Sequence, residues 1–236
     1  MVSFRDNMID ESKMKQVELD LFQNRVEQAV PAAVEIISAL DMDDDDEASA
    51  ASGMMSKVLR SEGAYDFVRR LAESGFDFKV RFPDGATVTT LFATRGVSDP
   101  AAFRALVEAG ADPMSCNRAG SNALHILASM EKSSFARSRE PEMAEIAGIP
   151  ENPSDWMFTN AYGATPLHLA VLFGHHELVS ALLDLVDDVD AMGAEVRPGY
   201  GHAVDFNGKT PLGVASLIGD DVSASLLLDH GADPGV

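Results

Sequence analysis

Apolar residues recur every three or four positions along several short stretches of the chain, which is the spacing of a helix that buries one face. Residues 65–72 and 99–109 show this spacing most clearly. Asp99 and Pro100 suit the N-cap and the first position of the second helix, and a glycine follows each stretch. The pattern therefore predicts short amphipathic helices that are separated by turns.

The first forty residues carry a longer apolar pattern. Apolar side chains between Val17 and Val30 predict a helix of about four turns. We expect Pro31 to break this helix, because proline lacks the N–H that a helix interior needs. Residues 32–40 then predict a second helix. This pair is interpreted either as an N-terminal cap or as a first repeat that has lost its signature.

Residues 41–47 contain six acidic residues and one methionine, and small residues follow at 48–53. A calcium loop of the EF-hand type needs glycine at its sixth place and glutamate at its twelfth, where the chain has Asp46 and Ser52. We therefore interpret residues 41–53 as a mobile acidic linker, with a contact for a basic partner as the alternative. Residues 54–63 predict the next helix.

One short phrase recurs along the chain. It reads Thr-Pro-Leu-His-Leu-Ala at 165–170, Thr-Pro-Leu-Gly-Val-Ala at 210–215 and Asn-Ala-Leu-His-Ile-Leu-Ala at 122–128. A turn with glycine precedes each copy, and Gly-Ala-Asp-Pro stands at 110–113 and 231–234. We align Thr89 with the first position of a fourth, degenerate copy. The phrase and the Gly-Ala-Asp turn resemble the ankyrin repeat.

This resemblance implies an all-α ankyrin-repeat solenoid, in which helix-turn-helix repeats carry β-hairpin fingers and follow an N-terminal helical cap. Residues 1–53 would form the N-terminal helical pair and acidic linker, and residues 54–236 the repeat array. The repeats are expected at about 54–84, 85–116, 117–159, 160–204 and 205–236. The resemblance also implies that His125 and His168 tie neighbouring loops together, and that Thr165 and Thr210 cap helices.

The net charge is −20, and it is unevenly distributed. Residues 161–236 hold eleven acidic residues, against Arg197 and Lys209 as the basic ones. Such a surface repels nucleic-acid phosphate and anionic lipid and attracts basic proteins. We therefore expect a basic protein partner, no nucleic acid and no membrane, and a monomeric chain. Solubility alone is the alternative explanation of the charge.

The single Cys116 excludes an internal disulfide and fits a reducing compartment. The chain has no run of about 18 apolar residues, and its N-terminus lacks the apolar core of a signal peptide. We expect a cytoplasmic protein, and delivery into a host cell without such a signal stays open.

Residues suited to catalysis or metal binding form no recognisable pattern. The chain contains neither a G-x-S-x-G nucleophile elbow nor a G-x-x-x-x-G-K-[ST] phosphate loop. His175 and His176 match no zinc spacing, and we expect them in a solvated turn. The sequence predicts no catalytic residue, no metal and no cofactor.

Two long segments, 148–162 and 187–207, carry the clearest functional signal, because loops seldom hold so many aromatic residues. They are expected to be neighbouring fingers. The candidate partner-binding residues are Trp156, Met157, Phe158, Tyr162, Asp188, Asp190, Tyr200, His202 and Phe206. Either the two fingers pack on each other as a structural core, or these aromatics are an interface hot spot.

Ankyrin arrays serve mainly as scaffolds for binding proteins, so the resemblance implies a protein-interaction module and not an enzyme. The chain would bind its basic partner through the extended fingers and the concave face. One alternative is an acidic inhibitor, of the immunity or effector type, that blocks a basic enzyme. Another is a regulatory ankyrin fragment of a longer enzyme.

Overall fold

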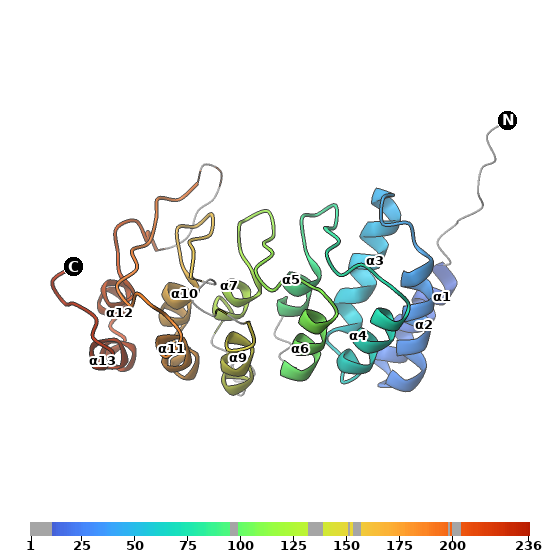
Figure 1. The fold of residues 1–236 in the computed structure, drawn as a ribbon, viewed down its shortest axis with the longest axis horizontal. Helices are drawn as coiled ribbons and strands as arrows, with labels where there is room; N and C mark the ends of the chain where they lie inside the picture. The colour runs from blue at the N-terminus through green and yellow to red at the C-terminus, as the bar shows by residue number, and fades with distance from the viewer. Residues whose placement is uncertain are drawn as a thin grey trace.

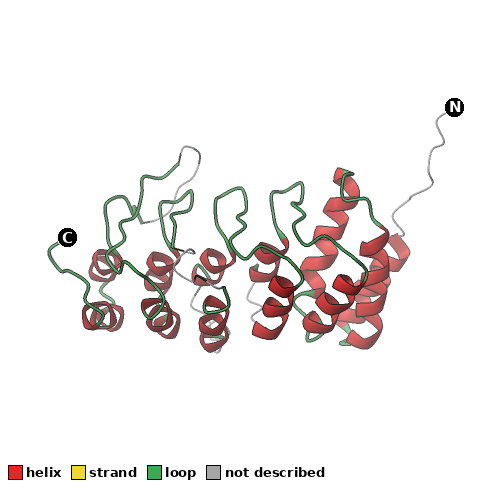
Figure 2. Cartoon of the chain, viewed as in Figure 1, coloured by secondary structure: helices red, strands yellow, loops and turns green. Residues whose placement is uncertain are grey.

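The computed structural model describes residues 11–94, 99–131, 139–150, 152, 157–197, 199 and 204–236. In this described part the protein consists of twelve helices and loops, with two isolated β-bridges and no sheet (Figure 2). The helices form the pairs α1 (Glu11–Phe22) and α2 (Val26–Ala39), α3 (Asp45–Val58) and α4 (Ala64–Glu73), α5 (Val88–Ala93) and α6 (Pro100–Glu108), α7 (Ala123–Ala128) and α9 (Glu140–Ala147), α10 (Pro166–Phe173) and α11 (His176–Leu183), and α12 (Pro211–Ile218) and α13 (Asp221–Asp229). None of these helices is long and apolar enough to span a bilayer.

The pairs stack into an elongated array with two rows of helices (Figure 1). In one row α1, α3, α5, α7, α10 and α12 each contact the next, and in the other row α2, α4, α6, α9, α11 and α13 do the same. The loops before α5, α7, α10 and α12 project to one side of the array (Figure 1). The predicted all-α solenoid is confirmed.

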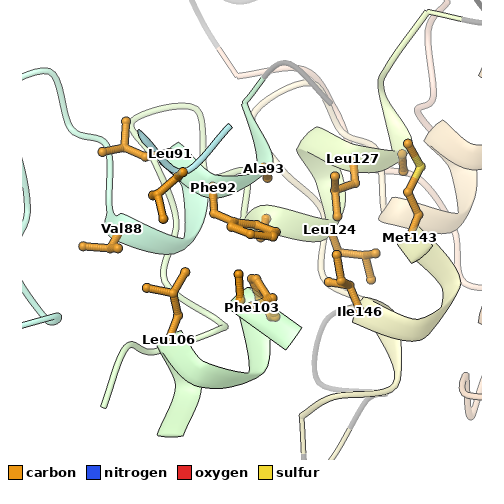
Figure 3. Close-up of a cluster of buried hydrophobic side chains, with 14 of the residues drawn as sticks. Val88, Leu91, Phe92, Ala93, Phe103, Leu106, Leu124, Leu127, Met143 and Ile146 are labelled. Carbon is orange, nitrogen blue, oxygen red and sulfur yellow. The ribbon is translucent and has the colours of Figure 1, made fainter. Parts of the chain in front are cut away.

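The hydrophobic core runs along the array between the two rows. Phe92 of α5 and Phe103 of α6 are fully buried, and their ring centroids lie 5.2 Å apart. Leu124 of α7 and Ile146 of α9 continue the core into the next pair (Figure 3). Each pair therefore buries its apolar faces against its neighbours as well as against itself.

The expected helix break at Pro31 is wrong. Helix α2 continues through Pro31, which is exposed, so water can satisfy the one carbonyl group that loses its helical partner. The break lies seven residues earlier, at Asn24, whose φ of 57° is left-handed. Asparagine tolerates this conformation, and Arg25 fixes the turn through its backbone N–H, which donates to the carbonyl oxygen of Asp20 at 2.7 Å.

The acidic segment is not a linker. Asp44 is the N-cap of α3, and its carboxylate accepts the backbone N–H groups of Asp46 and Glu47, both at 3.0 Å. The acidic residues of the first turn also suit the positive end of the helix dipole. Helix α3 then runs through residues 48–53, so the expected boundary at residue 54 falls inside it.

The structure also corrects the alignment of the degenerate repeat. The cap of α5 is Thr87 and not Thr89. A left-handed glycine stands two residues before the caps of all four inner helices that carry the phrase, at Gly85, Gly120, Gly163 and Gly208. This glycine was the sequence signal that locates Thr87 correctly.

Candidate functional site

Four loops of the array form the candidate site. We name them finger 1 (76–87), finger 2 (110–122), finger 3 (148–165) and finger 4 (184–210). The described parts of all four project from the same side of the helix rows (Figure 1). Fingers 3 and 4 hold the residues that the sequence singled out for partner binding.

Backbone hydrogen bonds join fingers 2, 3 and 4. The Ala161 N–H donates to the carbonyl oxygen of Ala119 at 2.8 Å, and the Arg197 N–H donates to that of Ala161 at 2.9 Å. The Ala194 N–H donates to the carbonyl oxygen of Gly163 at 2.8 Å. A Cβ atom at residue 163 would overlap with the Ala194 carbonyl group, so only glycine permits this approach. The three fingers thus form one connected unit.

Two buried histidines attach fingers 3 and 4 to the helices. His125 Nε2 lies 3.0 Å from the carbonyl oxygen of Phe158 and 3.2 Å from that of Ala164. His168 Nε2 lies 2.8 Å from the carbonyl oxygen of Lys209. Burial lowers the pKa of both histidines to about 4, although the hydrogen bonds to carbonyl groups act in the opposite direction. Both rings are therefore neutral at pH 7 and donate from Nε2, which confirms the predicted structural role.

The caps beside these histidines differ. The Thr165 hydroxyl accepts the backbone N–H of His168 at 3.3 Å and can donate to Nδ1, which is 2.7 Å away. Asn122 Oδ1 accepts the backbone N–H of His125 at 3.0 Å and also lies 2.7 Å from its Nδ1. When Nε2 of His125 donates, its Nδ1 carries no proton. Because Asn122 Oδ1 is also an acceptor, this second contact is not a hydrogen bond. Asn122 Nδ2 is also buried without a hydrogen-bond partner, so the cap of α7 is poorly satisfied.

Three of the predicted aromatic and apolar residues pack inward. Phe206 is fully buried, and its ring centroid lies 5.8 Å from that of His168, so it cannot contact a partner at the surface. This corrects its assignment as a binding residue. Phe158 is half-buried, with its ring centroid 5.1 Å from that of His125, and Met157 packs against the core. These contacts favour the structural explanation for this part of the fingers.

The predicted acidic residues lie at the base of finger 4. Asp188 is exposed, and its carboxylate accepts the Asp190 N–H at 3.0 Å. Asp190 is half-buried and accepts the N–H of Asp233 at 3.1 Å, which links finger 4 to the last loop. Tyr162 is half-buried in finger 3. The predicted residues Trp156, Tyr200 and His202 lie outside the described residues.

The acidity of the loops has a structural cause that was not predicted from the sequence. The side chains of several aspartates accept the backbone N–H two residues further along, which closes a tight turn. They are Asp77, Asp84, Asp112, Asp188, Asp205 and Asp233. The recurring Gly-Ala-Asp-Pro segments were the sequence signal from which such turns could have been predicted. Part of the negative charge is therefore a consequence of how the loops fold.

The turn at His175 is not solvated, contrary to our expectation. His175 is fully buried, and its Nε2 lies 2.8 Å from the carbonyl oxygen of Met130. The buried Glu140 accepts the N–H of Glu177 at 3.0 Å and lies 3.4 Å from His175 Nδ1. These contacts join α9 to α11. In the described part, no group of three or more His, Cys, Asp or Glu side chains is arranged to hold a metal ion.

Comparisons with known proteins agree with this architecture. Residues 134–236 match the family model described as ankyrin repeats (3 copies). The B-cell lymphoma 3 protein homolog of Mus musculus is 31% identical over 144 residues, which cover 60% of this chain and 29% of that protein. The chain therefore spans less than a third of the length of this relative.

A solved structure shares the fold. The crystal structure of the ankyrin repeat domain of Bcl-3, described as a unique member of the IkappaB protein family, superposes with a TM-score of 0.55 at 24% sequence identity. The match covers 77% of this chain and 68% of that one. At this identity the likeness concerns the fold alone.

Proposed function

We propose that this chain, which is an ankyrin-repeat protein, is a protein-interaction module that binds a basic protein partner through fingers 3 and 4 and the adjoining concave face. The observation that carries the proposal is the backbone connection of these fingers. Because the Ala194 N–H donates to Gly163 and the Arg197 N–H to Ala161, the described parts of the two fingers are held together at these positions. A preorganised surface loses less conformational entropy when a partner binds.

The charge of this surface supports a basic partner. Asp187, Asp188, Glu195 and Asp205 are exposed on finger 4, where Arg197 is the one exposed basic residue of the described part. Exposed carboxylates contribute mainly to the association rate and to orientation. We therefore expect the association rate to fall steeply as the salt concentration rises.

An apolar contact on the same finger complements the charge. Met192 is 56% exposed, although the residues on both sides of it are better covered. Methionine adapts to the shape of an apolar partner surface. Trp156, Tyr200 and His202 join the proposed surface on sequence grounds, together with Tyr162.

We infer a binding role and not an enzymatic one, because the polar clusters of the described part hold the array together. His125 and His168 attach fingers to helices, and His175 with Glu140 joins α9 to α11. An inhibitor that covers a basic enzyme is the second candidate, and the acidic finger 4 favours it. Both candidates act as a cytoplasmic monomer that binds neither nucleic acid nor membrane.

Site-specific photocrosslinking tests the proposal. A photoreactive amino acid is placed at Met192 of finger 4 and, as the matched control, at Glu108, which is exposed on α6 in the other helix row. In lysate of the source cell we expect a salt-sensitive adduct with a basic protein from position 192 and none from position 108. Adducts of equal yield from both positions, or none from position 192, would contradict the proposal.

The aromatic anchors are tested with the partner that crosslinking identifies. We expect Trp156→Ala or Tyr200→Ala to weaken binding by at least about 2 kcal/mol, because buried aromatics dominate interface energetics. Isothermal titration calorimetry measures the binding, and a thermal melt of each variant reports folding. If either variant unfolds the array, that residue is structural and leaves the proposed surface.

A further inference from the structure

A pocket of about 420 Å³ opens between fingers 1 and 2, at the opposite end of the finger row from the acidic finger 4. Finger 1 contributes Lys79, Arg81 and Thr87 to its lining, and finger 2 contributes Asp112 and Ser115. Phe78 supplies apolar wall. The pocket is large enough to admit a side chain or a small ligand.

Two cations at this pocket are not neutralised by a carboxylate. The Lys79 ammonium makes no hydrogen bond or ion pair within the described residues. Arg81 is exposed, and its Nη1 donates to the carbonyl oxygens of Cys116 at 2.5 Å and Gly85 at 3.3 Å, so the guanidinium spans the two fingers. The one acid of the lining, Asp112, already accepts the Met114 N–H at 2.9 Å. Two of the lining side chains are cationic and one is anionic, so the pocket carries a net positive charge.

Between fingers 1 and 2, hydroxyl groups occupy the place that an imidazole ring occupies between fingers 2 and 3 and between fingers 3 and 4. Thr90 occupies the position of His125 and His168, but its hydroxyl donates to the Thr87 carbonyl within its own turn at 3.0 Å. The Ser115 hydroxyl lies 2.7 Å from the carbonyl oxygen of Asp112, to which it can donate, and 3.0 Å from the hydroxyls of Thr87 and Thr89. A hydroxyl group can rotate from one acceptor to another, so Ser115 can donate to a bound anion in exchange for its bond to Asp112, whereas the ring of a buried histidine cannot turn in this way.

We propose that the pocket between fingers 1 and 2 binds an oxyanion, a carboxylate or phosphate group, carried by a side chain of the partner protein. Lys79 and Arg81 supply the charge, and Ser115 supplies a hydrogen bond. Arginine and lysine bind these groups through short, charge-assisted hydrogen bonds. This role deepens the proposed protein-binding function and rests on it for the source of the anion.

The pocket also sets the direction in which a partner lies along the fingers. Its acidic or phosphorylated residue would sit at finger 1, and its basic residues would face Asp187, Asp188 and Glu195 on finger 4. A partner bound in the reverse direction would place like charges against each other at both ends, which is unfavourable.

The test is a titration of the isotopically labelled full chain with sodium phosphate and, separately, with sodium acetate, followed by the NMR signals of its backbone amides. The ionic strength is held constant with sodium chloride. We expect saturable shifts at residues 78–81, 87 and 112–115. Lys79→Gln should weaken the apparent affinity about threefold to fivefold, as expected for the loss of one exposed charge. Lys15→Gln, which removes the same charge from the exposed face of α1, should leave the affinity unchanged.

Each outcome has a defined meaning. Tighter binding of phosphate than of acetate supports the pocket and identifies a phosphorylated partner residue, and comparable binding supports it with aspartate or glutamate as the source. Shifts that are absent from these residues, or that Lys79→Gln leaves unaltered, overturn the proposal. Because Lys79 is exposed and its side chain makes no hydrogen bond or ion pair in the described part, its variant has no structural reason to unfold. The titration needs no partner, so failure of crosslinking at Met192 would overturn the proposed function separately.

Discussion

Fingers 1 and 2 are joined by side chains, whereas fingers 2, 3 and 4 are joined by their backbones. Arg81 reaches from finger 1 to the carbonyl group of Cys116, and Arg118 reaches back from finger 2 to that of Pro83. In fingers 2 to 4, the bonds between Ala119, Ala161 and Arg197 involve no side chain. A connection through long side chains leaves space between two loops, whereas direct backbone hydrogen bonds bring the two loops into contact.

One repeat architecture can therefore present two kinds of surface. Direct backbone pairing requires a residue without a Cβ atom at the point of closest approach, and Gly163 satisfies that requirement. The equivalent turn at Gly85 faces the side chain of Arg118 instead. The two turns share the glycine and differ in what lies against it, a side chain at Gly85 and a backbone carbonyl group at Gly163.

The largest predicted effect comes from a substitution that disrupts the backbone contact between fingers 3 and 4. Gly163→Ala should destabilise the protein by about 3 kcal/mol or more, because its Cβ atom overlaps with the Ala194 carbonyl group in addition to the cost of a left-handed alanine. Gly85→Ala should cost less, about 2 kcal/mol, since it meets a side chain and not a backbone group, although moving Arg118 aside disturbs its bond to Pro83. Urea unfolding of the two variants measures the difference, and equal losses would contradict this account.

Acid should loosen fingers 3 and 4 selectively, because their joins contain His125 and His168 and the join between fingers 1 and 2 contains no histidine. The folded pKa of each histidine, about 4, lies below the unfolded value of 6.5, so the unfolded chain binds protons first as the pH falls. Stability is therefore complete above about pH 6.5, falls between pH 6.5 and 4, and levels off below that range. Each histidine contributes up to roughly 3 kcal/mol to this loss.

Urea unfolding between pH 7 and pH 4 measures this dependence. The variants His125→Gln and His168→Gln should each flatten it, since they remove one titrating group. A wild-type protein that is equally stable at pH 7 and pH 4.5 would show that these rings are not buried in the neutral form.

A smaller change should improve the poorer cap. Asn122→Thr introduces a hydroxyl that can accept the backbone N–H of His125 and donate to its Nδ1, and it removes the unpaired Nδ2. We expect a gain of about 1 kcal/mol, and the reverse exchange Thr165→Asn should lose a similar amount. Urea midpoints of the two variants give both values. Destabilisation by Asn122→Thr would contradict the proposed conflict at this cap.

The fold could be predicted from the sequence because each repeat is a local unit with its own turn, cap and apolar stripe. Errors arose where local rules conflict. The Thr89-Thr90-Leu91 segment imitates the Thr-Pro-Leu phrase, although Gly85 marks Thr87 as the cap. The acidic residues around Asp44 were interpreted as a linker, because charge alone does not distinguish a loop from the exposed first turn of a helix.

The candidate site was less predictable, because its geometry depends on residues far apart in the chain. Nothing near Gly163 in the sequence indicates that Ala194 lies against it. Phe206 has the composition of an interface anchor, and it is buried only because finger 4 closes over the position of His168. Aromatic residues in a loop therefore indicate that the finger is packed, and they do not by themselves identify a binding surface.

Hydrogen exchange at individual amides tests the central difference between the fingers most directly. The amides of Ala194 and Arg197 bond across two fingers, whereas that of Ala86 bonds only to the carboxylate of Asp84 in its own turn. We expect Ala194 and Arg197 to exchange at least about tenfold more slowly than Ala86, with protection that approaches global unfolding. Exchange at Ala194 and Arg197 as fast as at Ala86 would contradict the backbone connection of fingers 3 and 4.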